Sequence, residues 1–170
     1  MNAWRLALGI WLLAASGCGY ALEGTRRPEA LKDVRNIAIP VFVNETREPG
    51  LERTMTDAVR SRFLLDGRLR VVESPEADVV LEAAVREYKL EPIGFSQADQ
   101  VRRYRVFIRT QVRLRDLQRG RLILDQEIES DSEFDISASI AGSDALRLNT
   151  TTTAANSFAD ELISLVLEGF

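Results

Sequence analysis

Residues 36–67 read NIAIPVFVNETREPGLERTMTDAVRSRFLLDG, and this stretch organises the rest of the chain. It opens with a short apolar run, Ile37–Val43, that Pro40 interrupts, and a polar turn follows. Apolar residues then recur at helical spacing: Leu51, Met55, Ala58, Val59 and Phe63. Asp66-Gly67 is typical of a helix end, and Val71-Val72 opens a second apolar run. The pattern predicts a strand–helix–strand crossover with parallel strands. Pro40 cannot donate a ladder hydrogen bond, so the first strand should lie at a sheet edge or bend there.

Two later segments alternate between apolar and polar residues, as strands do. In residues 78–90, Val79 and Leu81 begin one face, and the other face holds Val80, Glu82, Ala84, Arg86 and Tyr88. Pro92 and Gly94 predict the end of this strand and a loop over residues 91–101. Residues 103–117 have an apolar face and an opposite face that carries Arg103, Arg105, Arg109, Arg113 and Arg115.

The next segment has a matching acidic face: Asp125, Glu127, Glu129, Asp131, Glu133 and Asp135. Its other face, which includes Leu122 and Leu124, should share the core with residues 103–117. Together the two segments predict a hairpin with a three-residue loop, Arg119–Arg121. In that register the opposed pairs are Arg115 with Asp125, Arg113 with Glu127, Arg109 with Asp131, and Arg105 with Asp135.

The chain ends with a predicted helix. A small-residue loop over Ser137–Ser143 precedes it, and the helix carries an apolar stripe of Ala155, Phe158, Ala159, Leu162, Ile163 and Val166. Residues 150–153 are four threonines, which are poor helix formers, so the helix should begin late or depend on packing for its first turns. We predict a single α+β domain over residues 36–170: one mostly antiparallel sheet of four to five strands, with two helices on one face.

The first seventeen residues have the form of a cleaved secretory signal. Arg5 is followed by an apolar segment, and Ala15-Ser16-Gly17 precede Cys18. Ala-Ser-Gly-Cys resembles the bacterial lipobox, in which the cysteine is acylated and becomes the mature N-terminus. We therefore expect a signal peptide over residues 1–17, lipidation at Cys18, and a tether over residues 18–35. Gly19 after the cysteine favours outer-membrane delivery, by resemblance to enterobacterial lipoproteins.

The composition argues against several classes of function. The chain has no histidine and one cysteine, so it offers no disulfide framework, no cysteine–histidine metal site and no histidine-based catalytic triad. It also lacks a glycine-rich phosphate loop. Removal of residues 1–17 leaves 21 basic and 26 acidic side chains, a net charge of −5, which disfavours nucleic-acid binding. We expect neither an enzyme nor a bound cofactor.

An ordered set of short motifs resembles the lipopolysaccharide-assembly lipoproteins of the LptE type. The set comprises Cys18-Gly19-Tyr20, Ile37-x-Ile39-Pro40-x-Phe42-x-Asn44-x-Thr46, Pro49-Gly50-Leu51-Glu52, Asp66-Gly67, Ala77-Asp78, Tyr104-Arg105 and the amphipathic C-terminus. The resemblance implies a lipoprotein that plugs a large outer-membrane β-barrel and helps deliver lipopolysaccharide to the outer leaflet. Its partners would be that barrel, lipopolysaccharide, and the membrane through N-terminal acyl chains.

The resemblance suggests which residues could contact lipopolysaccharide and the barrel. Arginine binds phosphate through its planar fork, so Arg102, Arg103 and Arg105 are candidates for lipopolysaccharide binding, and Arg102 and Arg103 have the less obvious acidic partners. Ile93 and Phe95 lie on the expected loop and are candidates for partner contact.

Two alternative functions remain open. Curli-secretion lipoproteins and penicillin-binding-protein activators share the strand–helix–strand opening, and a plain structural or lipid-binding lipoprotein would fit the same pattern.

Overall fold

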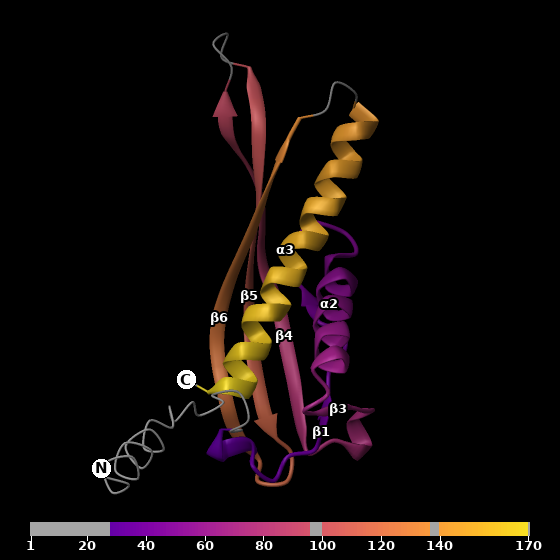
Figure 1. The fold of residues 1–170 in the computed structure, drawn as a ribbon, viewed down its shortest axis with the longest axis vertical. Coiled ribbons are helices and arrows are strands. Elements are labelled where there is room, and N and C mark those ends of the chain that lie inside the picture. Colours follow the sequence, from indigo (N-terminus) through magenta and orange to yellow (C-terminus); the bar gives the residue numbers. More distant parts are fainter. Residues whose placement is uncertain (1–27, 96–99, 137–139, 170) are drawn as a thin grey trace, which may run out of the picture.

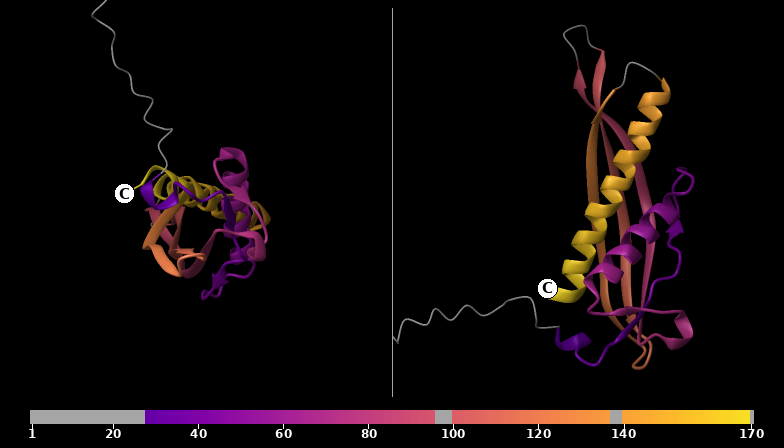
Figure 2. Two further views of the ribbon diagram at one scale, coloured as in Figure 1. Left: turned by 90° about the horizontal axis from the view of Figure 1, so that it is seen from below. Right: turned by 45° about the vertical axis from the view of Figure 1, so that its right-hand side comes forward.

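Three long antiparallel strands make up one side of a mixed six-stranded sheet. They are β4 (Val79–Phe95), β5 (Val101–Asp116) and β6 (Arg121–Asp135), and the sheet order is β3-β1-β4-β5-β6, with β2 also paired to β4. The computed structural model describes residues 28–95, 100–136 and 140–169. Helices α2 (Leu51–Asp66) and α3 (Ile140–Glu168) lie over the same face of the sheet (Figures 1 and 2). The predicted α+β class and the two-helix layer are confirmed, with a strand count slightly higher than expected.

The opening crossover forms as the sequence predicts. β1 (Asn36–Ala38), α2 and β3 (Arg70–Val71) follow one another, and β1 pairs in parallel with β3. Gly67 ends α2 with a φ of 71°, a left-handed conformation that glycine adopts without steric cost. β1 also pairs with β4, so it does not lie at the sheet edge. The strand is interrupted at the proline: pairing with β4 stops at Ala38, residues 39–42 including Pro40 are unpaired, and pairing resumes in β2 (Val43–Asn44).

The core fills the space between the helices and the sheet. Among its fully buried side chains are Phe63 on α2, Phe158 and Leu162 on α3, and Leu81 and Ile108 on the sheet. The rings of Phe42 and Phe158 meet edge to face with centroids 6.4 Å apart. The chain before β1 contributes as well. Leu31, in the short 3-10 helix η1 (Glu29–Leu31), and Val34 are both buried in this core.

A bulge in β4 overturns the expected position of Tyr88. Simple alternation puts Tyr88 on the charged face, but the register shifts between Val85 and Glu87. Beyond that point Tyr88 pairs with the buried Ile108, and its hydroxyl lies 3.1 Å from the hydroxyl of Thr151 on α3. The strand also runs on to Phe95 where Pro92 was expected to end it. Two further register shifts, at Pro92/Gly94 and Gly94/Phe95, accommodate the missing proline donor.

The predicted hairpin exists, but its predicted register is wrong by two residues. The observed pairs include Arg103 with Asp135, Arg105 with Glu133, Arg109 with Glu129 and Arg113 with Asp125. The register differs because the turn is longer than three residues and because the ladder shifts between Leu114 and Arg115. Arginines still face acids, since a shift of two preserves the face of every side chain. Leu122 does not keep its expected face: the prediction places it in the core, and it is 46% exposed.

Helix α3 begins earlier than predicted. It starts at Ile140, so the expected loop over Ser137–Ser143 is wrong from residue 140 onward, and residues 137–139 lie outside the described part. The helix continues through the threonine run. Thr151, Thr152 and Thr153 each donate to the carbonyl four residues earlier, and Thr150 and Thr151 are buried. Packing against the rest of the domain therefore compensates for the poor helix propensity, as the second alternative anticipated.

Candidate functional site

The outer end of the β4–β5 hairpin extends beyond the start of α3 (Figure 1). Near this tip, Gly94 pairs with Arg103 and Phe95 pairs with Val101. The two strands approach closely: a Cβ on Gly94 would lie 3.0 Å from the Cβ of Arg103, so only glycine fits without a shift. Residues 96–99, between the strands, lie outside the described residues. We define the tip as residues 90–95 and 100–105.

The tip carries exposed apolar surface. Phe95 is 59% exposed and Leu90 is 39% exposed, whereas Ile93 is only partly exposed. The expectation placed Ile93 and Phe95 on a loop, and the structure places both at the end of a strand. A large aromatic side chain at such a position has little core to pack against, so Phe95 is the stronger candidate for contact with a partner.

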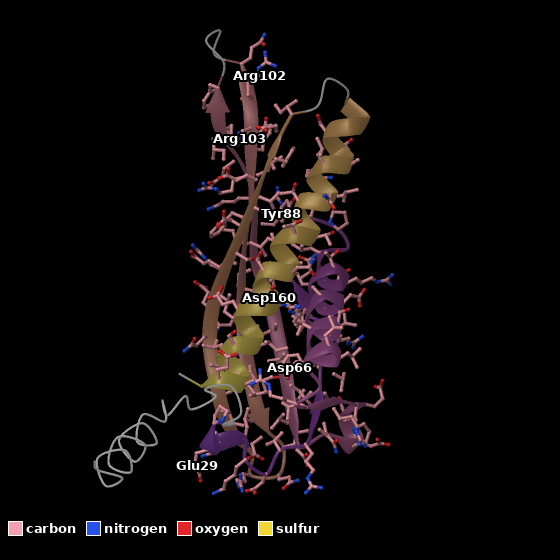
Figure 3. All side chains as sticks on the ribbon, viewed as in Figure 1. Glu29, Asp66, Tyr88, Arg102, Arg103 and Asp160 are labelled. Carbon is pink, nitrogen blue, oxygen red and sulfur yellow. The ribbon has the colours of Figure 1, made fainter. Side chains whose placement is uncertain are left out.

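The three candidate arginines differ in their surroundings. Arg103 Nε lies 2.8 Å from Asp135 Oδ1, and Arg105 Nη2 lies 2.7 Å from Glu133 Oε1. The hydrogen bonds to these carboxylates raise the pKa of both guanidinium groups, which are held as ion pairs. Arg103 was expected to have a less obvious acidic partner than the other arginines, and the structure gives it Asp135. Arg102 is exposed and has no ion pair among the described residues (Figure 3).

The rest of the charged face is neutralised within the sheet. Arg109 pairs with Glu129 at 2.8 Å and with Glu87 at 3.2 Å, and Arg113 pairs with Asp125 at 3.4 Å. These pairs are substantially exposed, so each contributes little stability and their main effect is on register. The described part of this face presents charges of both signs in close pairs.

A small cleft opens between the first turns of α3 and the sheet near the tip. It has a volume of about 170 Å³ and is lined by Leu90, Tyr104, Phe134, Ile136, Ser143, Asp144 and Arg147. The rings of Tyr104 and Phe134 stack with centroids 5.8 Å apart and form part of its wall. Sequence reasoning missed Leu90, Ile136 and Arg147 because it placed a loop where α3 begins. A prediction that began the helix at Ile140 would have placed Arg147 alongside the sheet.

The opposite end of the domain receives the N-terminal segment. Pro28 lies beside Gly169 at the end of α3, with its Cγ 3.6 Å from the position of an added glycine Cβ. Cys18 lies outside the described residues, so its lipidation remains a prediction. Within the described ranges, no helix combines the length and apolar composition needed to cross a membrane. The same ranges contain no cluster of side chains able to hold a metal ion.

Comparisons with known proteins agree with this architecture. No curated protein matches the sequence. The chain is similar in structure to rare lipoprotein B from Shewanella oneidensis, with 12% identity, a TM-score of 0.54, and coverage of 76% of this chain and 92% of that one. It is also similar to the PelC dodecamer from Paraburkholderia phytofirmans, with 18% identity, a TM-score of 0.56, and coverage of 84% and 96%. At these identities the likeness concerns the fold alone. The sequence gives the family directly: residues 34–166 match the lipopolysaccharide-assembly (LptE) family model, and the chain belongs to that family.

Proposed function

We propose that this protein is an outer-membrane lipoprotein that plugs a large β-barrel translocon and assists insertion of lipopolysaccharide into the outer leaflet. Family membership over residues 34–166 carries the proposal. The partners are the barrel, lipopolysaccharide, and the membrane that holds acyl chains on Cys18. The role consists of binding and positioning, and it assigns no catalytic step to the chain.

The charged sheet face supports a position inside a barrel. The lumen of a large outer-membrane barrel is polar and water-filled. A face built from Arg109, Arg113 and their acidic partners can lie against such a wall while staying hydrated, because its charges already balance one another. The core is kept on the other side of the sheet, under α2 and α3.

The tip supports contact with lipopolysaccharide, which carries phosphates and acyl chains. Arg102 supplies an exposed guanidinium that can bind phosphate through two parallel hydrogen bonds. Phe95 and the cleft beside Leu90 supply apolar surface of the kind that an acyl chain would cover. Arg103 and Arg105 hold the strands through their ion pairs, and we assign them a supporting role.

Extraction from membranes in mild detergent tests the barrel partner. The protein should be recovered in a one-to-one complex with a large β-barrel. Phe95→Asp should loosen that complex without unfolding the domain, whereas Leu65→Asp, at a site 77% exposed on α2, should leave it intact. A ring of identical copies would favour a secretion-type lipoprotein instead, and association with a peptidoglycan synthase would favour an activator.

Binding of purified lipopolysaccharide tests the tip. Arg102→Glu should weaken binding and leave the unfolding midpoint unchanged, because Arg102 has no ion pair to lose within the described residues. Arg53→Glu makes the same charge change at an exposed position on α2 and is the matched control. Equal binding by the two variants would remove Arg102 from the proposed site.

A further inference from the structure

The turn that joins β5 to β6 lies at the end of the domain opposite the tip (Figure 1), and its backbone is hydrogen-bonded to a buried side chain. Residues Leu117–Gly120 form it. The side chain of Asp116, only 3% exposed, accepts hydrogen bonds from the amides of Gln118 at 3.0 Å and Arg119 at 2.8 Å. Gly120 adopts a φ of 63°, which completes the turn without steric strain. These hydrogen bonds define the backbone of the turn and so the side from which each neighbouring side chain leaves it.

Two leucines, one in this turn and one just after it, are exposed to solvent. Leu117 is 43% exposed and Leu122 is 46% exposed. Alternation from Leu124, which is 3% exposed, would bury Leu122. The ladder prevents this, because Leu114 pairs with Leu124 while Arg115 pairs with Leu122, so Ile123 is an extra residue. Such a bulge changes the direction of a side chain. Here it brings Leu122 out of the core and onto the surface, two residues after the turn ends.

The same turn carries two arginines with different partners. Arg119 is held by Asp33 at 3.3 Å and by Asp116 at 3.4 Å. Arg121 is exposed and makes no ion pair within the described part of the chain. The turn thus presents two apolar side chains and one available cation, the combination that favours contact with the headgroup region of a lipid bilayer.

The position of the turn places it near the expected lipid anchor. Asp33, its ion-pair partner, lies five residues after Pro28, where the described chain begins. Cys18 is ten residues before Pro28, and ten residues span at most about 35 Å. An acyl group on Cys18 therefore keeps this end of the domain close to the membrane, wherever the rest of the domain points.

We infer that the β5–β6 turn is a membrane contact, in which Leu117 and Leu122 enter the headgroup region of the leaflet that holds the acyl chains and Arg121 pairs with a phospholipid phosphate. The inference rests on the proposed acylation of Cys18. Two leucines and one arginine bind a bilayer weakly on their own. The tether makes the contact intramolecular, with an effective concentration in the range of ~1 mM, and so makes a weak contact persistent.

Tryptophan fluorescence tests the contact directly. Both tryptophans, Trp4 and Trp11, precede Cys18, so the mature chain contains none and a single introduced tryptophan reports without background. The full acylated chain carrying Leu122→Trp is placed in vesicles of phosphatidylethanolamine and phosphatidylglycerol. Its emission should lie at a shorter wavelength than that of the same Leu122→Trp variant without acyl chains, measured in the absence of detergent. Lipids brominated on their acyl chains should quench the emission.

Leu148→Trp, at a site 58% exposed on α3, is the matched control and should show neither effect. Equal quenching of the two probes, or none at Leu122→Trp, would overturn the inference. So would a shift that occurs only when a β-barrel is added, because the turn would then bind protein. The intact mass of the same sample separates the membrane contact from the proposed acylation of Cys18. Acyl mass without quenching rejects the membrane contact alone. Absence of acyl mass rejects both the acylation and the membrane contact.

Discussion

Arg147 Nη1 lies 2.6 Å from Glu48 Oε1, and this contact joins the first half of α3 to the turn before α2. Both side chains are about three-quarters buried, with exposures of 27% and 21%. The hydrogen bond to Glu48 raises the pKa of Arg147, which stays charged. One turn further along α3, Tyr88 and Thr151 make a second connection at 3.1 Å. These contacts hold α3 against the domain where the threonine run weakens it.

A double-mutant cycle measures this contact. Because both groups are largely shielded from water, we expect Arg147→Ala and Glu48→Ala to show a coupling of about 1 kcal/mol in urea unfolding. The pair of Arg62 and Asp160 joins α2 to α3 with side chains about half exposed, at 48% and 50%, and is the control. Its coupling should fall below about 0.5 kcal/mol. Equal couplings would mean that burial does not distinguish the two pairs in solution.

The stripe on α3 should be core. Leu162 is completely buried between the helix layer and the sheet, so Leu162→Ala should destabilise the domain by about 2 to 5 kcal/mol. Leu148 lies on the same helix at 58% exposure, and Leu148→Ala should cost less than about 0.5 kcal/mol. The measurement is urea unfolding of both variants. A cost near zero at Leu162 would contradict the observed packing of α3.

The sequence predicts the main elements because their signals are local. Helical spacing from Leu51 to Phe63, the glycine stop at Gly67 and the alternation in β5 depend on neighbouring residues, and all three appear as expected. The errors arise where a β-bulge adds a residue to a strand and so breaks the alternation of its side chains. Tyr88 lies just after a register shift and Leu122 just before one, and one extra residue reverses the face of the side chains on one side of it relative to the other.

The candidate site is predictable only in part, for a related reason. Phe95 and Arg102 are exposed at the tip, as a turn-like sequence around Gly94 suggests. The pairing of Arg103 with Asp135 could not be anticipated, because it depends on the hairpin register. The cleft lined by Leu90, Ile136 and Arg147 depends on where α3 begins, and the threonine run hides that start.

Asp78 should make stability depend on pH. Its Oδ2 accepts hydrogen bonds from the amides of Arg35 and Asn36, each at 2.9 Å, and these lower its pKa. The unfolded chain, with a pKa near 3.9 at this group, then binds the proton more tightly than the folded state. The stabilisation is present above that pH and is lost as the pH falls through the lower folded pKa.

Urea unfolding from about pH 6 down to about pH 3 tests this dependence. Asp78→Asn should be less stable than the parent at neutral pH and should lose less stability on acidification. Glu76→Gln, a charge removal at an exposed position two residues earlier, is the control and should follow the parent curve. Parallel curves for the parent and Asp78→Asn would remove Asp78 as the cause.

Lipidation at Cys18 is the prediction on which the location of the protein depends. Small residues precede the cysteine after an apolar segment, as in a lipobox, and each buried methylene of an acyl chain contributes about 0.8 kcal/mol to membrane binding. Intact mass of membrane-extracted protein should therefore show a chain that starts at Cys18 and carries acyl chains. Cys18→Ser should leave an unlipidated precursor that retains residues 1–17, because a serine hydroxyl cannot form the thioether to diacylglycerol. A mature N-terminus elsewhere, without lipid mass, would contradict lipidation at Cys18 and remove the anchor from the proposed function.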